Sequence, residues 1–155
     1  AHVFGVNSEE WIKEIKIFEE LVKKITELSN KKSYTVISAD HGLTNVPKEN
    51  RFHITYNEDV NIYGDQRSVY INGSKKDIIE IFSKVPGQLI DRSELNYLLP
   101  IPENDFIESL YPDFCFLVED KNIIYPHHLK TELAGYHGGL STEEIKIPII
   151  EISNF

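Results

Sequence analysis

The feature that most constrains the fold is a continuous β-prone run at residues 34–39, which Asp40, His41 and Gly42 follow at once. An uninterrupted run of this kind is typical of a strand that is covered on both faces in a parallel sheet. Asp40 and His41 would then lie at the carboxyl end of that strand, where open α/β sheets bind their ligands. The pattern predicts an α/β fold with polar groups at a ligand-binding edge.

The rest of the chain alternates between helical and strand patterns. Apolar residues recur at helical spacing over residues 8–29, and Asn7 and Glu10 have the spacing of a capping box. Ser74 is the predicted N-cap of a second, short helix, and Ser141 begins another capping-box pattern. Further strands are predicted at 67–71, 114–118, 122–125 and 148–152, with the middle two forming a hairpin. We expect a mostly parallel central sheet with helices on both faces.

Composition and charge exclude several classes of protein. The 155 residues are 41% hydrophobic and 26% charged, as in a single globular domain with a real core. The net charge of -9 disfavours general nucleic-acid binding, and the single Cys115 excludes an internal disulfide. The sequence shows neither a membrane-spanning apolar stretch nor a signal peptide, so we expect a cytoplasmic location.

The beginning of the chain is unusual. It starts at Ala1 and contains no methionine. We therefore expect residues 1–155 to form one domain that is itself a fragment of a larger catalytic domain.

Two short motifs contain candidate metal ligands. Asp40 and His41 form one, and His137 lies in the other, between Tyr136 and two glycines. Carboxylates and imidazoles suit Zn²⁺ and related divalent cations, and glycines allow the backbone to approach a ligand closely. Taken singly, each motif is better explained as a turn cap or a loop histidine than as a metal site. Together they indicate a metal site assembled from loops, and so a hydrolase of charged esters.

The remaining histidines carry weaker signals. His2 is uninformative by itself. His53 alternates with Phe52 and Ile54, which is typical of an exposed strand residue. We interpret His127 and His128 as part of a solvated loop.

The order of these motifs resembles the C-terminal half of the alkaline phosphatase superfamily. The sequence Ala1-His2-Val3-Phe4-Gly5 precedes the long helix, and the Asp-His-Gly motif follows the predicted strand. The sequence Gly135-Tyr136-His137-Gly138-Gly139 then precedes the final strand. The order is most similar to the type I phosphodiesterase/nucleotide pyrophosphatase branch, and the last segment also resembles PglZ domains.

This resemblance implies a site with two divalent metal ions, zinc with manganese as the alternative. It assigns Asp40 and His41 to one metal, and His2 and His137 to the other. The family's nucleophile, a threonine or serine, matches no residue of this chain and is expected upstream of Ala1, so no catalytic nucleophile is assigned here. The resemblance thus implies hydrolysis of phosphodiester or pyrophosphate bonds by the parent protein, with the isolated chain inactive.

Two alternatives stay open at this point. One is a metal-dependent phosphomutase of the same superfamily, and the other is a non-catalytic PglZ-like interaction module. For an enzyme, the expected partner is a small phosphodiester or nucleotide. Because a chain with half of a sheet leaves strand edges and apolar faces uncovered, a homo-oligomer is also expected.

Overall fold

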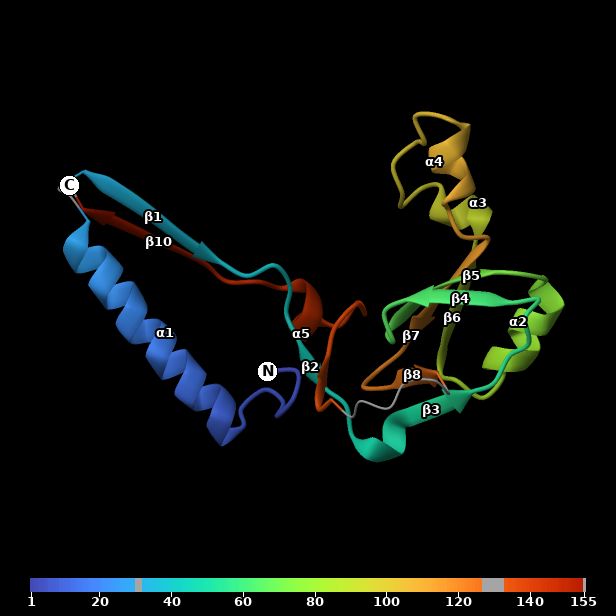
Figure 1. The fold of residues 1–155 in the computed structure, drawn as a ribbon, viewed down its shortest axis with the longest axis horizontal. Helices are drawn as coiled ribbons and strands as arrows, with labels where there is room; N and C mark the ends of the chain where they lie inside the picture. The colour runs from blue at the N-terminus through green and yellow to red at the C-terminus, as the bar shows by residue number, and fades with distance from the viewer. Residues whose placement is uncertain (30–31, 127–132, 155) are drawn as a thin grey trace. The chain divides into compact units, whose positions relative to one another are not determined.

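The computed structural model describes residues 1–29, 32–126 and 133–154 (Figure 1). The chain divides into two compact units. Unit 1 comprises Ala1–Asn45, Glu132–Tyr136 and Ser141–Phe155, and unit 2 comprises Val46–Thr131 and His137–Leu140. The prediction that residues 1–155 form one domain stays a prediction.

Unit 1 is built from paired strands and helices. Its elements are α1 (Glu9–Leu28), β1 (Ser33–Ser38), β2 (Thr44–Asn45), β9 (Gly135–Tyr136), α5 (Thr142–Ile145) and β10 (Ile149–Asn154). β1 pairs with β10, and β2 pairs with β9, both antiparallel. Each pair therefore joins a segment from the first third of the chain to one near its end.

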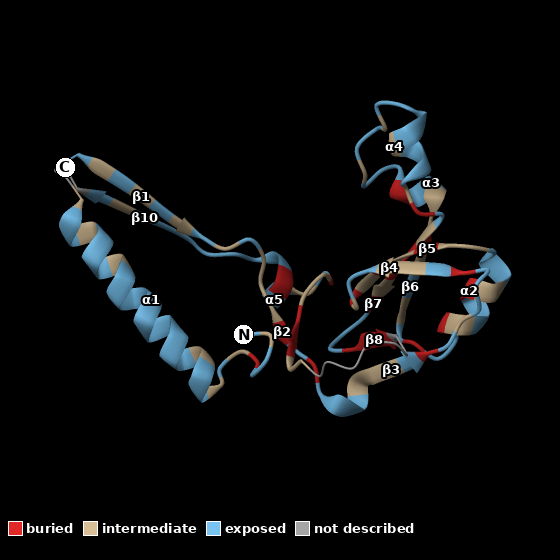
Figure 2. Ribbon diagram, viewed as in Figure 1, coloured by how far each residue is buried: buried red, intermediate tan, exposed pale blue. Residues whose placement is uncertain are grey.

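The predicted helix over residues 8–29 is confirmed as α1, but its cap is not the predicted one. Ser8 is the N-cap, and its hydroxyl accepts from the Trp11 N–H at 3.1 Å. Asn7 has a φ of 66°, so it belongs to the turn before the helix. The predicted Asn7–Glu10 capping box is therefore wrong. The described structure buries no residue of α1, as Figure 2 shows.

The environment of β1 also differs from the prediction. The only described partner of β1 is β10, and Tyr34 and Val36 on one face are 58% and 53% exposed. The parallel central sheet is not confirmed, because β3 and β8 are the only parallel pair among the described strands. A β-prone run specifies a strand, but the partner and its direction depend on distant residues. The predicted mixture of helices and strands is confirmed, so the chain has a mixed α/β fold.

Unit 2 contains most of the described strands. Its elements are a 3₁₀ turn (Lys48–Asn50), β3 (Arg51–Ile54), β4 (Asn61–Gly64), β5 (Ser68–Asn72), α2 (Lys75–Phe82), β6 (Gly87–Asp91), α3 (Arg92–Leu95), α4 (Asp105–Ser109), β7 (Phe114–Val118) and β8 (Ile123–Pro126). An antiparallel sheet has the order β4-β5-β7-β6, and β3 pairs with β8 beside it. The predicted strands at 67–71, 114–118 and 122–125 are present as β5, β7 and β8.

Local signals in unit 2 are more reliable than predicted pairings. Ser74 is the N-cap of α2, as predicted, and accepts from the Asp77 N–H at 3.2 Å. The predicted hairpin of β7 with β8 is wrong, because β7 pairs with β5 and β6 while β8 pairs with β3. In unit 1, Ser141 precedes α5 but its side chain makes no capping hydrogen bond. His127 and His128 lie outside the described residues.

The main core of unit 2 forms where α2 packs on the sheet. Ile78 and Phe82 of α2 are buried, and the Phe82 and Phe116 rings stack with centroids 4.6 Å apart. Ile71, Ile123 and Ile124 are completely buried on the strands. Burial of this apolar area is the main force that stabilises the unit. Throughout the part of the chain that the structure describes, every helix is too short or too polar to cross a membrane.

Cys115 gives a direct test of this core. It is buried in β7, and burial raises the pKa of its thiol to about 11. Because the thiolate is the reactive form, we expect the folded protein to resist iodoacetamide near neutral pH and the urea-unfolded protein to react readily. Mass spectrometry of timed samples measures the difference. Equal alkylation rates in the two states would contradict the buried position of β7.

Candidate metal centre

The Asp-His-Gly motif lies in unit 1, in the loop between β1 and β2. The Gly42 N–H donates to the carbonyl of Glu144 at 2.8 Å, and the Leu43 N–H donates to the carbonyl of Glu143 at 3.0 Å. A Cβ atom at position 42 would overlap the carbonyl oxygen of Glu143. The glycine of the motif is therefore required because the loop closes directly against the backbone of α5.

The β2–β9 pair fixes the backbone position of Tyr136, the residue directly before His137. Thr44 lies opposite Tyr136, and both residues are buried. Leu43, two residues after His41, directly precedes Thr44 in the chain. His137 is bonded to Tyr136, so this short ladder brings the second motif to the first.

The N-terminal segment joins the same ladder. The carbonyl of His2 accepts from the N–H groups of Ala134 and Gly135 at 2.8 and 3.0 Å. A Cβ atom at Gly135 would overlap the side chain of Leu43 and lie 3.0 Å from the carbonyl oxygen of Ala1. Gly135, in the second motif, thus permits a close approach of its own backbone to Leu43 and to the N-terminal segment, which are distant from it in sequence.

Backbone carbonyls define the tautomers of two histidines. Nδ1 of His2 lies 3.0 Å from the carbonyl oxygen of Gly135, and Nδ1 of His41 lies 2.7 Å from that of Gly42. A carbonyl oxygen can only accept, so we assign the proton to Nδ1 in both rings. In the neutral imidazole, Nε2 then holds the lone pair, which is the arrangement expected of a metal ligand whose other nitrogen has a backbone partner.

Three histidine side chains lie together, all of them half-buried. One ring nitrogen from each of His2, His41 and His137 lies within 4.8 Å of the others. The rings of His2 and His41 meet edge to face with centroids 6.2 Å apart. Two nitrogens on one zinc ion can be at most about 4.2 Å apart, given Zn–N bonds of about 2.1 Å. Small side-chain adjustments would thus bring the three nitrogens to ligand spacing, and the donor set suits zinc.

Asp40 lies next to this cluster through His41. Its Oδ1 accepts from the His41 N–H at 3.0 Å, while its Oδ2 lies 3.7 Å from His41 Nε2. The second distance is too long for a hydrogen bond but close to the roughly 3.4 Å that separates two ligands of a tetrahedral zinc ion. The Asp40 side chain is 88% exposed, so its carboxylate can rotate toward a cation. Asp40 and His41 therefore also fit a shared ion.

The other described histidine does not join the cluster. His53 is exposed on β3, as predicted, and its ring meets that of Tyr125 edge to face at 5.1 Å between centroids. Sequence reasoning missed the carbonyls of Gly135, Glu143 and Glu144, since no side chain marks a backbone acceptor.

Comparison with solved structures identifies the class of fold. No family model matches the sequence, and no curated protein matches it either. The structure nevertheless shares its fold with solved structures that are named as ectonucleotide pyrophosphatase/phosphodiesterases and as a phosphonoacetate hydrolase. The resemblance inferred from the motifs is thus confirmed at the level of the fold.

Three solved structures illustrate the match. Murine ectonucleotide pyrophosphatase/phosphodiesterase 5 has a TM-score of 0.69 at 16% identity, over 96% of this chain and 43% of its own. The human protein of the same name has a TM-score of 0.68 at 12% identity, over 97% and 43%. Phosphonoacetate hydrolase from Sinorhizobium meliloti has a TM-score of 0.67 at 14% identity, over 97% and 42%. The chain therefore spans less than half the length of these structures.

Replacement of Gly42 tests how the loop is held. We expect Gly42→Ala to lower the free energy of unfolding by about 2 kcal/mol or more, because the methyl group meets the Glu143 carbonyl and breaks the adjacent hydrogen bonds. Urea denaturation measures the change. Ser38→Ala, at an exposed position nearby, is the control and should change stability by less than about 0.5 kcal/mol. Equal stability of both variants would show that the loop does not close against α5.

Proposed function

We propose that this chain contributes metal ligands to a hydrolase of phosphodiester or pyrophosphate bonds. The observation that carries the proposal is the convergence of His2, His41 and His137, with Asp40 beside them. The fold supports it, because the similar structures are named as a pyrophosphatase/phosphodiesterase and a phosphonoacetate hydrolase. One of these structures contains AMP and another contains phosphonoacetate, so a small substrate with a phosphorus-centred anion is proposed here.

The proposed ligand set is the one that the family resemblance implies. Asp40 and His41 bind one divalent cation, and His2 and His137 bind the second, with zinc at both positions and manganese as the alternative. Such cations, when bound, stabilise the attacking and leaving oxygens of an in-line displacement at phosphorus. The carbonyl of Gly42 accepts from Nδ1 of His41, and the carbonyl of Gly135 accepts from Nδ1 of His2. Both rings are therefore already oriented with Nε2 available, and little side-chain conformational entropy would be lost when a cation binds.

The negative net charge of the chain fits a site in which bound metal cations, rather than basic side chains, attract the phosphate. A net charge of -9 would repel a phosphate diester unless cations intervened, whereas the same charge favours cation capture. The nucleophile is proposed to lie outside this chain, as the resemblance implies. The expected homo-oligomer and cytoplasmic location also remain proposals.

Activity measurements test the proposal. We expect the isolated chain to show no turnover of bis-(p-nitrophenyl) phosphate with added Zn²⁺ or Mn²⁺, because covalent catalysis needs a positioned hydroxyl near the metal. The longer protein that we expect to contain this chain should cleave the substrate. Asp40→Asn or His137→Ala in that protein should abolish cleavage, whereas His53→Ala should not change it.

Two results would count against the proposal. Robust metal-dependent turnover by the isolated chain would mean that a complete site lies within these residues. Unchanged activity of the longer protein after both Asp40→Asn and His137→Ala would mean that the ligands are wrongly assigned.

A further inference from the structure

The N-terminal segment that carries His2 is clamped by an asparagine of β2. The side chain of Asn45 bonds both main-chain groups of one residue: its Oδ1 accepts from the Val6 N–H at 2.7 Å, and its Nδ2 donates to the Val6 carbonyl at 2.9 Å. A backbone N–H can only donate and a carbonyl can only accept, so these partners fix the orientation of the amide. Asn45 thus binds the segment much as a neighbouring strand would.

The backbone of Asn45 lies at a second point of attachment for the same segment. Asn45 is opposite Gly135 in the β2–β9 pair. The Gly135 N–H donates to the His2 carbonyl at 3.0 Å, and the Gly135 carbonyl oxygen lies 3.0 Å from His2 Nδ1. This one cross-strand pair therefore holds the segment twice, at Val6 through a side chain and at His2 through the main chain.

A tight turn joins the two points of attachment. The Gly5 N–H donates to the Ala1 carbonyl at 2.7 Å, and the φ of Gly5 is 87°, in the region that favours glycine. A Cβ atom on Gly5 would lie 2.8 Å from Oδ1 of Asn45. The turn therefore brings its backbone directly against the Asn45 amide.

Apolar packing contributes little to holding this turn. Val3 and Phe4 are 61% and 59% exposed, and the helix that follows, α1, has no buried residue in the part of the chain that the structure describes. The Ser8 hydroxyl donates to the Gly5 carbonyl at 2.9 Å, so the N-cap of α1 is joined to the turn. The two hydrogen bonds of the Asn45 amide are therefore a large part of what fixes residues 2–6.

We propose that Asn45 is a positioning residue of the metal centre: its amide holds residues 2–6 so that His2 keeps Nδ1 on the Gly135 carbonyl and uses Nε2 for the cation. This inference rests on the proposed function, which assigns His2 to a metal. Both ends of the amide are bonded to Val6, so Asn45 acts through His2. It sets the fraction of molecules in which His2 is ready to bind, and the apparent dissociation constant rises as that fraction falls.

The first test reads the histidine tautomers of the full chain, labelled with ¹⁵N and free of metal, at about pH 8.5, where ordinary imidazoles are neutral. Long-range ¹H–¹⁵N NMR spectra distinguish a proton on Nδ1 from a proton on Nε2. We expect the Nδ1–H form at His2 and at His41 in the unaltered chain. Asn45→Ala should convert His2 mainly to the Nε2–H form of a solvated imidazole. His41 should keep its Nδ1 proton, because its acceptor is the Gly42 carbonyl.

The second test adds Zn²⁺ to the same samples and follows the His2 ring. Because two hydrogen bonds that fix the segment are lost, Asn45→Ala should weaken zinc binding at His2 about fivefold or more. Asn45→Asp keeps an acceptor for the Val6 N–H but has no donor for the Val6 carbonyl. It should shift the His2 tautomer in the same direction, and it decides the question if Asn45→Ala does not fold.

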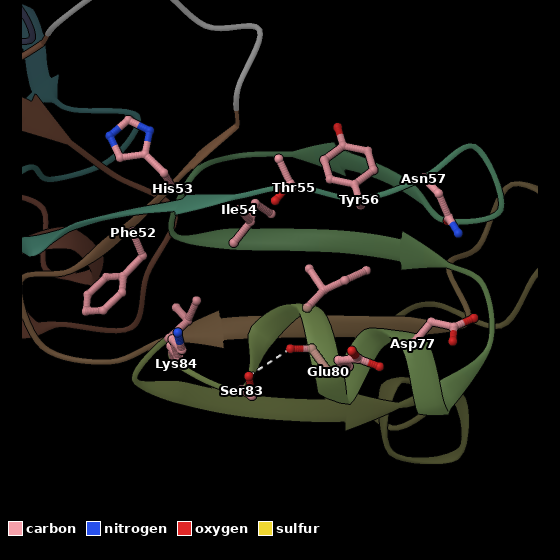
Figure 3. A pocket seen from close by; sticks show the side chains of 12 residues that line it. Phe52, His53, Ile54, Thr55, Tyr56, Asn57, Asp77, Glu80, Ser83 and Lys84 are labelled. Atoms are coloured by element: carbon pink, nitrogen blue, oxygen red, sulfur yellow. Dashed lines mark hydrogen bonds between the residues drawn. The ribbon is translucent and has the colours of Figure 1, made fainter.

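Two controls show whether the effect is specific. Asn50→Ala is the matched variant, because the Nδ2 of Asn50 also donates to a backbone carbonyl, that of Lys121 at 3.0 Å, in unit 2. It should leave the tautomer of His2 and its zinc affinity unchanged. His53 is the internal reference: it lies on β3 and lines the pocket that Figure 3 shows, and its ring signals should be the same in every variant.

The inference and the proposed function fail in different ways. An unchanged Nδ1–H form of His2 in both Asn45 variants would overturn the inference, as would loss of that form at His41 as well. Loss of the form at His2 with unchanged zinc affinity would show that the clamp does not serve the metal. Absence of zinc binding by the unaltered chain would instead contradict the proposed function, and the tautomers would still decide whether Asn45 positions His2.

Discussion

The backbone contact of Gly42 and Leu43 with Glu144 and Glu143 is the interaction on which the candidate metal centre depends. It fixes the loop that carries Asp40 and His41, and it leads directly into the β2–β9 pair that positions His137. His2 joins through two hydrogen bonds to its carbonyl oxygen. The imidazoles of His2 and His41 are also oriented by main-chain carbonyls, which lose little conformational entropy when a ligand binds. Glycine is needed where these backbones approach most closely.

Local signals in the sequence predicted elements well. The helical spacing of apolar residues predicted α1, and Ser74 predicted the start of α2. Pairings were predicted poorly, because they depend on residues far away in the chain. The apolar run of β1 gave no sign that β10 would pair with it antiparallel, and the adjacent strands β7 and β8 were wrongly joined into a hairpin. A strand's composition reports its burial and propensity, not its partner.

In the candidate site, too, local residue types were predictable from the sequence, whereas contacts between distant segments were not. Asp40, His41 and His137 could be selected from the sequence because side-chain type and neighbouring glycines mark them. The hydrogen bonds that define the tautomers of His2 and His41 could not, since their acceptors are carbonyls. α1 was predicted from its apolar spacing, yet several of its apolar side chains are exposed in the described structure, so spacing predicted the helix but not the burial of its apolar face.

The most direct test of the account is the coordination of zinc by the full chain. Zinc-edge X-ray absorption, combined with calorimetric titration, reports both the ligands and the affinity. We predict imidazole ligation at about 2.0–2.1 Å with weak or partial occupancy, and loss of imidazole scattering in His41→Ala and His137→Ala. His53→Ala should change neither the imidazole signal nor the affinity for zinc. Tight binding of two zinc ions that survives His41→Ala and His137→Ala, with the imidazole signal unchanged, would contradict the proposed metal centre.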